Sequence, residues 1–290
     1  MPDLILSGRR ADLGHGLIVQ RLLPHREKRM VGPFVFYDHA GPVVLPEADG
    51  RRADVRPHPH IGLATVSYLL SGAMVHRDSL GSDLKIAPGE VNWMTAGRGI
   101  SHSERFEAAE AFHAPGLELL QSWVALPEAD EEIEPAFDHY GTDALPQGND
   151  DGRWLRVVTG SAYGLTSPVK TRSPMFYVHM ELDDGARFTL PEGYSERAFY
   201  VVRGAVACDG RRIEAGHLAV IPEHAAPRLA AIGETLVMLL GGEPLGQRYL
   251  WWNFVSSSRE RIEQAKADWL AGRIALPPND NAEFIPLPDK

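Results

Sequence analysis

The chain has 290 residues, of which 44% are hydrophobic and 23% are charged, so its composition is that of a folded globular protein and excludes a disordered one. Its formal net charge of −10 disfavours direct binding to nucleic acid or to an anionic membrane, because both carry negative charge. Cys208 is the single cysteine, which excludes an intramolecular disulfide and a cysteine-based zinc cluster.

The sequence also lacks the signals of membrane insertion and export. No apolar run approaches the roughly 20 residues that span a bilayer. The start, MPDLILSGRRADLGHG, has no basic region followed by a long apolar one, which a secretory signal would require. We therefore expect a cytoplasmic protein with no membrane partner.

Short strand-like runs separated by turn residues fill both halves of the chain. They include LIVQRLL, PFVFYDH, ATVSYLL and EVNWMTA in the first half, and WLRVVTG, MFYVHMEL, RAFYVVRGAVA and TLVMLLG in the second. The 22 prolines and 28 glycines are scattered between such runs, which is typical of many short strands. Residues 126–153 are acidic and rich in proline, glycine and aspartate, as expected of a connection between domains.

A faint internal repeat indicates a duplicated architecture. YLLSGAM (68–74) resembles YVVRGAV (200–206), and each is followed by a turn glycine before an apolar run, in IAPGEVNWM (86–94) and IEAGHLAVI (213–221). We predict an all-β protein of two antiparallel β-sandwich or barrel domains, residues 1–135 and 136–290, in which closure protects the strand edges.

The C-terminal part predicts one helix. In SSSRERIEQAKADWLAGRI (256–274), Ser258 is a suitable N-cap and Gly272 a suitable stop. Apolar side chains recur at helical spacing between them and predict an amphipathic helix packed on the sandwich. These side chains are Ile262, Ala265, Trp269 and Leu270.

Two histidines in RPHPHIGLATVSYLL (56–70) stand apart from the single histidines elsewhere. Side chains at i and i+2 of a strand share a face, so His58 and His60 project together. If 58–70 is one inward-facing strand, the same face continues through Gly62, Ala64 and Val66, and both imidazoles lie at the mouth of an apolar interior. Their buried nitrogens would then need partners. This pair alone leaves open a metal site or the polar edge of an ordinary strand.

A second pair lies in MTAGRGISHSERF (94–106), where His102 and Glu104 are again i and i+2. Gly97 and Gly99 allow a tight turn that delivers this pair into the barrel mouth. Three imidazoles and one carboxylate suit Fe(II), Mn(II), Ni(II) or Cu(II), with positions left for water, oxygen or substrate. The two pairs together predict a mononuclear metal site.

These residues carry a resemblance to a known family. HPHIGLATVSYLLSGAMVHRDSLGS, followed by PGEVNWMTAGRGISHSER, resembles the N-terminal domain of the pirins, a branch of the cupin superfamily. GPFVFYDHAGP (32–42) and GGEPLG (241–246) extend the resemblance toward both ends. It implies a bicupin, with two jelly-roll domains and a C-terminal helix. General cupins take a glutamate a few residues after the HxH pair, but Ala64 stands there, which favours the pirin branch.

The resemblance also implies the ligands and the metal. A mononuclear non-haem iron, as Fe(II), would be bound by His58, His60, His102 and Glu104, with Mn, Ni, Cu and Zn as alternatives. In the second half, Leu190 and Glu192 align with His58 and His60, so that domain is expected to lack a metal.

The function implied is that of a quercetin 2,3-dioxygenase, which cleaves a flavonol with dioxygen and releases carbon monoxide. Glu104 would be both a ligand and the catalytic proton acceptor. Two alternatives stay open: an iron-dependent, redox-sensing regulator that acts through protein partners, and a cupin acting on another small metabolite. Candidate walls for a flat aromatic substrate are Val35, either Phe34 or Phe36, Val66, Tyr68, Trp93, Met94 and Trp123.

Overall fold

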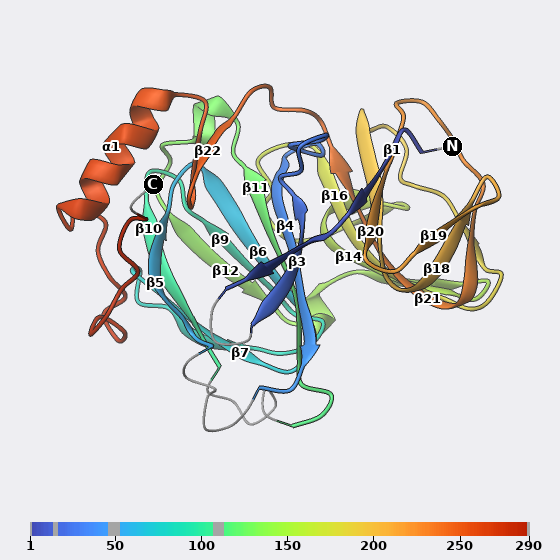
Figure 1. Ribbon diagram of the computed structural model, residues 1–290, viewed down its shortest axis with the longest axis horizontal. Helices are drawn as coiled ribbons and strands as arrows, with labels where there is room; N and C mark the ends of the chain where they lie inside the picture. Colours follow the sequence, from blue (N-terminus) through green and yellow to red (C-terminus); the bar gives the residue numbers. More distant parts are fainter. Residues whose placement is uncertain (1, 14–16, 46–52, 107–112, 289–290) are drawn as a thin grey trace. The chain divides into compact units, whose positions relative to one another are not determined.

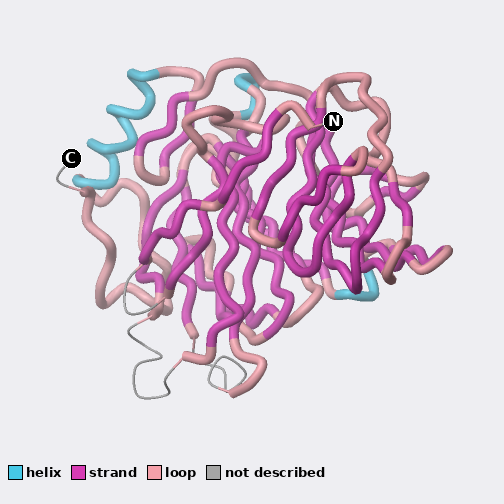
Figure 2. Tube along the Cα trace, turned by 45° about the vertical axis from the view of Figure 1, so that its right-hand side comes forward, coloured by secondary structure: helices cyan, strands magenta, loops and turns pink. Residues whose placement is uncertain are grey.

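The structure is a computed structural model that describes residues 2–13, 17–45, 53–106 and 113–288. Strands dominate it, and helix is confined to short segments (Figure 2). In the described part of the chain the helical segments include α1 (Arg259–Leu270) and two 3-10 turns, Glu128–Asp130 and Thr142–Ala144. None of the helices in these ranges is long and apolar enough to cross a membrane.

The strands follow one another along the whole chain. They are β1 (Leu4–Ser7), β2 (Arg9–Asp12), β3 (Ile18–Leu23), β4 (Phe34–Val43), β5 (Val55–His60), β6 (Leu63–Ser71), β7 (Met74–Asp78), β8 (Asp83–Ile86), β9 (Val91–Thr95), β10 (Ile100–Arg105), β11 (Leu117–Ala125), β12 (Ala136–Tyr140), β13 (Gln147–Asp150), β14 (Arg153–Ala162), β15 (Leu165–Thr166), β16 (Met175–Leu182), β17 (Arg187–Phe188), β18 (Glu196–Cys208), β19 (Arg211–Glu214), β20 (His217–Ile221), β21 (Leu229–Gly242), β22 (Tyr249–Trp251) and β23 (Phe254–Ser256).

Within the described residues these strands form four sheets built of antiparallel pairs. The orders are β1-β20-β18-β21-β16-β14-β13, to which β15, β17 and β19 also pair; β12-β9-β6-β11-β4-β3-β2; β5-β10-β7-β8; and β22-β23. Short, closely spaced strands of this kind agree with the all-β prediction, and the acidic connection at 126–153 carries two of them, β12 and β13.

Contacts divide the chain into two compact units that are not consecutive in sequence. One comprises Met1–Arg9, Gln20–Tyr37 and Tyr140–Pro244, and the other comprises Arg10–Val19, Asp38–His139 and Leu245–Lys290. The chain passes from the second unit to the first after His139, close to the boundary expected between residues 135 and 136. That boundary stays a prediction.

Each unit has its own apolar core, built from the side chains that point inward at every second position along a strand. In the first unit β16 contributes Phe176, Val178 and Met180 to a cluster with residues of β18 and β21. The core of the second unit includes Leu69, Met74 and Phe106. Burial of side chains of this size stabilises the fold by about 1.5–3 kcal/mol each.

The first strand of the chain lies in the sheet of the C-terminal half. β1 lies beside β20 (Figure 1). The two strands pair antiparallel, with Leu4 opposite Val220 and Ser7 opposite His217. Leu6 is fully buried there. The two strands belong to the same compact unit.

The chain between residues 58 and 70 is not one strand, which corrects the sequence-based expectation. β5 ends at His60 and β6 begins at Leu63 in a different sheet. Gly62 between them has φ +66°, and a Cβ there would lie 2.0 Å from the carbonyl oxygen of Val255. A left-handed turn against this backbone separates the two strands, so the apolar run that follows Gly62 does not share a face with the histidines.

The helix prediction is confirmed, with one exception. Figure 1 shows α1 near the C-terminal end of the chain. Its N-cap is Ser258, whose hydroxyl accepts a hydrogen bond from the Arg261 amide, and Gly272 after the helix has φ +67°. Ile262 and Trp269 are buried, but Leu270 is 75% exposed. Leu270 is eight positions after Ile262, which turns it about 80° away from the packed face.

The segment after α1 runs back along the four-stranded sheet (Figure 1). The amide of Ile285 donates to the carbonyl oxygen of Pro57 at 2.8 Å, and the hydroxyl of Ser101 donates to the carbonyl oxygen of Ala275 at 2.6 Å. The C-terminal residues therefore hold both β5 and β10 from one side.

Candidate metal centre

Three of the four predicted ligands lie together on the neighbouring strands β5 and β10. The antiparallel register places His102 opposite His58, and His60 projects beside His58 from the same strand. One ligand nitrogen from each of the three histidines lies within 4.8 Å of the other two. All three side chains are buried, and a buried three-histidine group of this kind can bind a metal ion.

A turn before β10 brings His102 to this place. Gly97 has φ +50°, and a Cβ on it would lie 2.0 Å from the carbonyl oxygen of Ile133. The amide of Gly99 closes the turn by donating to the carbonyl oxygen of Ala96 at 2.9 Å. This turn agrees with the prediction that the glycines of TAGRG allow a tight turn before His102.

Burial keeps the three imidazoles uncharged. It lowers the pKa of His58 to about 4, an effect that the hydrogen bond to Arg56 partly opposes. Burial also lowers the pKa of His60 and His102 well below the ordinary value, and the neighbouring imidazoles add to the effect. Neutral imidazole is the form that binds a metal, so no proton has to leave at neutral pH.

The partners of two rings fix which nitrogen carries the hydrogen. Nδ1 of His58 lies 2.9 Å from the carbonyl oxygen of Arg56, and Nδ1 of His60 lies 3.1 Å from that of Asn253. A carbonyl oxygen only accepts, so both Nδ1 atoms donate and both Nε2 atoms keep a lone pair. Nε2 of His60 faces Nε2 of His102 at 3.1 Å. His58 and His60 can therefore each offer the Nε2 lone pair to a metal ion.

Glu104 is placed differently from the histidines. It follows on β10 after a register shift, is 7% exposed, and its Oε1 has no hydrogen-bond partner among the residues that the structure describes. Burial raises the pKa of its carboxyl group to about 7. Its oxygens are not part of the three-histidine group. The structure thus gives a buried carboxyl group on the ligand strand, and its role as a ligand stays a prediction.

The sequence analysis missed three side chains that border the group. His76 and Asp78 on β7 are fully buried or nearly so, and β7 pairs with β10 opposite His102 and Glu104. The ring of Phe137 stacks on His76 with centroids 4.2 Å apart. The sequence MVHRDS carries the signal, since His76 and Asp78 have the same i, i+2 spacing as the pair in HPH and the pair in HSE.

The candidate substrate walls are all buried, which by itself is what core packing requires. Trp123 contacts a proposed metal ligand, because its ring and that of His60 make an edge contact with centroids 5.0 Å apart. All of these candidate walls, Trp123 included, stay predictions.

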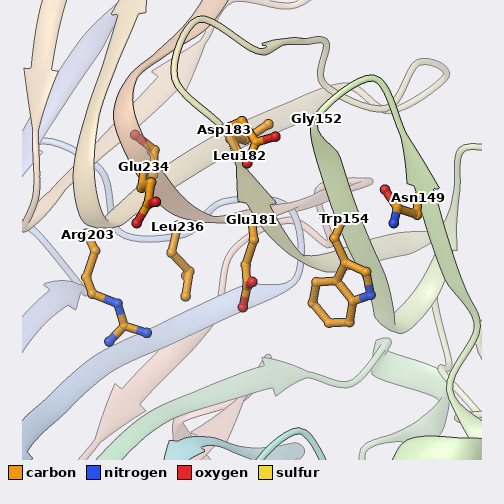
Figure 3. Close-up of a pocket in the computed structure, with 10 residues that line it drawn as sticks. Asn149, Gly152, Trp154, Glu181, Leu182, Asp183, Arg203, Glu234 and Leu236 are labelled. Atoms are coloured by element: carbon orange, nitrogen blue, oxygen red, sulfur yellow. The ribbon is translucent and has the colours of Figure 1, made fainter.

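The unit that contains Tyr140–Pro244 has a separate, polar pocket of about 590 Å³ (Figure 3). Its lining residues are Asn149, Gly152, Trp154, Glu181, Leu182, Asp183, Arg203, Glu234, Thr235 and Leu236, and they include no histidine. Leu190 and Glu192, which align with His58 and His60, lie in a loop after β17.

Comparisons with known proteins agree with this fold. The Pirin family model matches residues 16–124, and the model of the Pirin C-terminal cupin domain matches residues 177–275. A pirin-like protein from Caulobacter vibrioides is 51% identical over 290 residues, all of this chain and all of that protein. The prediction of two cupin domains followed by a helix is confirmed.

Solved structures extend the comparison. The crystal structure of quercetin 2,3-dioxygenase from Acinetobacter baumannii matches with a TM-score of 0.89 at 34% identity, covering 99% of this chain and 96% of that one. A bacterial pirin from Escherichia coli, solved in complex with nickel(II), matches with a TM-score of 0.65, covering 83% of this chain and 99% of that one. At 20% identity the second match shows the fold alone.

Proposed function

Because the chain belongs to the pirin family, we propose that it is a metal-dependent oxygenase of the quercetin 2,3-dioxygenase type, with a flavonol and dioxygen as substrates. The observation that carries the proposal is the buried group of His58, His60 and His102. The likeness of the chain to the Acinetobacter baumannii quercetin 2,3-dioxygenase, over nearly its whole length, supports the reaction class.

The proposed reaction needs a bound metal ion and a proton acceptor. His58, His60 and His102 would hold the metal, Fe(II) in our proposal, with Glu104 as the fourth ligand. A divalent metal there supplies Lewis acidity, which lowers the pKa of a flavonol 3-hydroxyl group. Glu104 accepts the hydroxyl proton, because a carboxyl group with a pKa of about 7 is matched to proton transfer near neutral pH. Burial of the three histidines and Glu104 limits the access of bulk water to the reacting groups.

Metal content and turnover test the proposal together. The protein is purified without oxygen, its bound metal is quantified, and flavonol loss is followed with carbon monoxide release after oxygen is admitted. We expect close to one Fe(II) per chain and coupled flavonol loss and carbon monoxide release. His58→Ala and His102→Ala should lose both metal and turnover, because each removes one of three imidazole ligands.

His224→Ala is the matched control, since that histidine is 89% exposed and lies outside the three-histidine group. It should bind metal like the wild type. Unchanged loading in His58→Ala and His102→Ala would remove the metal site from the proposal. Iron bound without flavonol turnover would contradict the oxygenase and favour the regulator or a different substrate.

A further inference from the structure

The third ligand candidate lacks the kind of partner that orients the other two. Nδ1 of His58 and Nδ1 of His60 each face a backbone carbonyl oxygen, which dictates their tautomer. Nδ1 of His102 instead lies 3.4 Å from Nδ1 of His76. An imidazole nitrogen can donate or accept, so this contact alone leaves two arrangements.

Asp78 decides between the two arrangements. Its Oδ1 accepts hydrogen bonds from the amides of Leu80 at 2.9 Å and Ser82 at 3.1 Å, and its Oδ2 lies 3.0 Å from Nε2 of His76. Two backbone amides that donate to the same carboxyl group favour its ionised form. An ionised carboxylate only accepts, so Nε2 of His76 carries the hydrogen.

The rest of the chain of contacts follows from that hydrogen. With its hydrogen on Nε2, the imidazole of His76 has a lone pair on Nδ1, and this atom accepts from Nδ1 of His102 at 3.4 Å. His102 therefore keeps its lone pair on Nε2, the atom that faces Nε2 of His60 at 3.1 Å. All three ligand candidates then present Nε2 in the same form, although only two of them face a carbonyl oxygen.

We propose that Asp78 and His76 are positioning residues that hold His102 in the Nδ1–H tautomer and so direct its Nε2 lone pair to the metal. The proposal rests on the metal site of the proposed function but not on the identity of the substrate. Carboxylate–histidine pairs behind a ligating histidine raise its basicity and fix its orientation.

The packing around the pair supports a fixed geometry. His76 is 2% exposed and Asp78 is fully buried. The ring of Phe137 lies nearly parallel to that of His76, at an interplanar angle of 9°, which restricts rotation of the imidazole. Pairing of β7 with β10 sets Asp78 opposite His102, so the backbone holds the two residues in register.

Asp78→Asn should reverse the tautomer of His76 while keeping the shape of the side chain at position 78. The amide oxygen has to stay on the side of the Leu80 and Ser82 amides, since both donate, so the new NH₂ group faces Nε2 of His76. Nε2 then accepts, Nδ1 carries the hydrogen, and two N–H groups face each other unless His102 also reverses. We expect the affinity for Ni(II) to fall roughly 10- to 100-fold.

The tautomer itself is read in the metal-free protein labelled with ¹⁵N-histidine, through two-bond proton–nitrogen correlations. His102 should be the Nδ1–H form in the wild type and the Nε2–H form in Asp78→Asn. Because this measurement needs no metal, it tests the pair even if the wild type binds no Ni(II), which would contradict the proposed function separately. A wild type with His102 as the Nε2–H form overturns the inference.

Two matched sets of variants exclude a merely structural role. His76→Asn offers an amide oxygen near the position of Nδ1 and should keep most of the Ni(II) affinity. His76→Leu introduces a side chain with the shape of asparagine but no acceptor, so the Ni(II) affinity should fall. Asp78→Asn should cause no further loss in the His76→Leu background. Asp83→Asn is the control on β8, because Asp83 contacts the side chain of Arg77.

The opposite results would overturn the inference. If Asp78 only stabilises the turn at Leu80–Ser82, Asp78→Asn lowers the unfolding temperature but leaves the tautomer and the Ni(II) affinity as in the wild type. Equal affinities of His76→Asn and His76→Leu, or fully additive losses in the double variant, would contradict the pair as well.

Discussion

The guanidinium group of Arg105 makes a two-pronged hydrogen bond to the carboxylate of Asp280, with Nε to Oδ2 and Nη2 to Oδ1 both at 2.7 Å. Arg105 ends the strand that carries His102 and Glu104, and alternation along β10 places it on the other face, together with Ser103. The hydroxyl of Ser103 donates to the same carboxylate at 2.6 Å. The ligand strand is therefore held from behind by the C-terminal segment.

Asp280→Asn should destabilise the fold. The substitution removes the charge that faces Arg105 and leaves an N–H group where Arg105 donates, at a site where the two side chains are only 9% and 13% exposed. We expect a loss on the order of 2 kcal/mol in the free energy of unfolding, measured with urea. Glu283→Gln is the control, since Glu283 also contacts Arg105 but is 48% exposed, and should cost less than about 1 kcal/mol. Equal effects of the two variants would contradict the role of Asp280.

The contribution of Asp280 should depend on pH. Burial acts to raise the pKa of Asp280, but the hydrogen bonds from Arg105 and Ser103 outweigh it and hold the pKa below the ordinary 3.8. A carboxyl group with a lowered folded-state pKa stabilises the fold fully above its unfolded pKa, and this stabilisation is lost as the pH falls through the folded one. The stability difference between wild type and Asp280→Asn should be constant from pH 7 to about 5 and shrink below pH 3.8. A difference that grows on acidification would contradict this sign.

Gly62→Ala should be far more damaging than the same change at an open glycine. At Gly62 an added Cβ meets the Val255 carbonyl oxygen at 2.0 Å, whereas at Gly216, with φ +83°, nothing lies within 4 Å. Gly216→Ala should lose about 1–2 kcal/mol from the left-handed conformation alone. Gly62→Ala adds a backbone clash beside His60, so we expect a larger loss in urea unfolding. Similar losses for the two variants would contradict the close approach.

Glu104→Gln should separate metal binding from proton transfer. The amide cannot take up a proton, so flavonol turnover should fall about 100-fold or more if Glu104 is the base. The amide oxygen can still ligate, and the three imidazoles are unchanged, so metal should be retained at the concentrations of the assay. The measurement is the rate of carbon monoxide release per bound metal ion. Undiminished turnover with intact metal would remove Glu104 as the proton acceptor.

The sequence was most informative where a local pattern determines the geometry. Alternation along strands was enough to pair His58 with His60, and the capping signals at Ser258 and Gly272 were enough to locate α1. The site depends on more than that. Asn253, whose carbonyl oxygen orients His60, is distant in sequence, and no pattern connects the two.

Other features were misjudged because non-local packing decided them. Gly62 breaks the apolar run after His60 because the Val255 backbone approaches it, and this neighbour cannot be read from residues 56–70. His76 and Asp78 had the right spacing, but their importance follows from the pairing of β7 with β10, which is a property of the sheet. Local periodicity therefore identified the ligand strands, and tertiary pairing supplied what orients the ligands.

The pairing of β1 with β20 has a consequence for the order in which the chain is made. Residues 4–7 leave the ribosome long before their hydrogen-bonding partner, residues 217–220, has been synthesised. Contacts of such large sequence separation slow folding, because the conformational entropy of the intervening loop is lost before the strand pair contributes stability. Until β20 appears, an apolar strand with Leu6 at its centre has an unpaired edge, which makes incomplete nascent chains prone to associate.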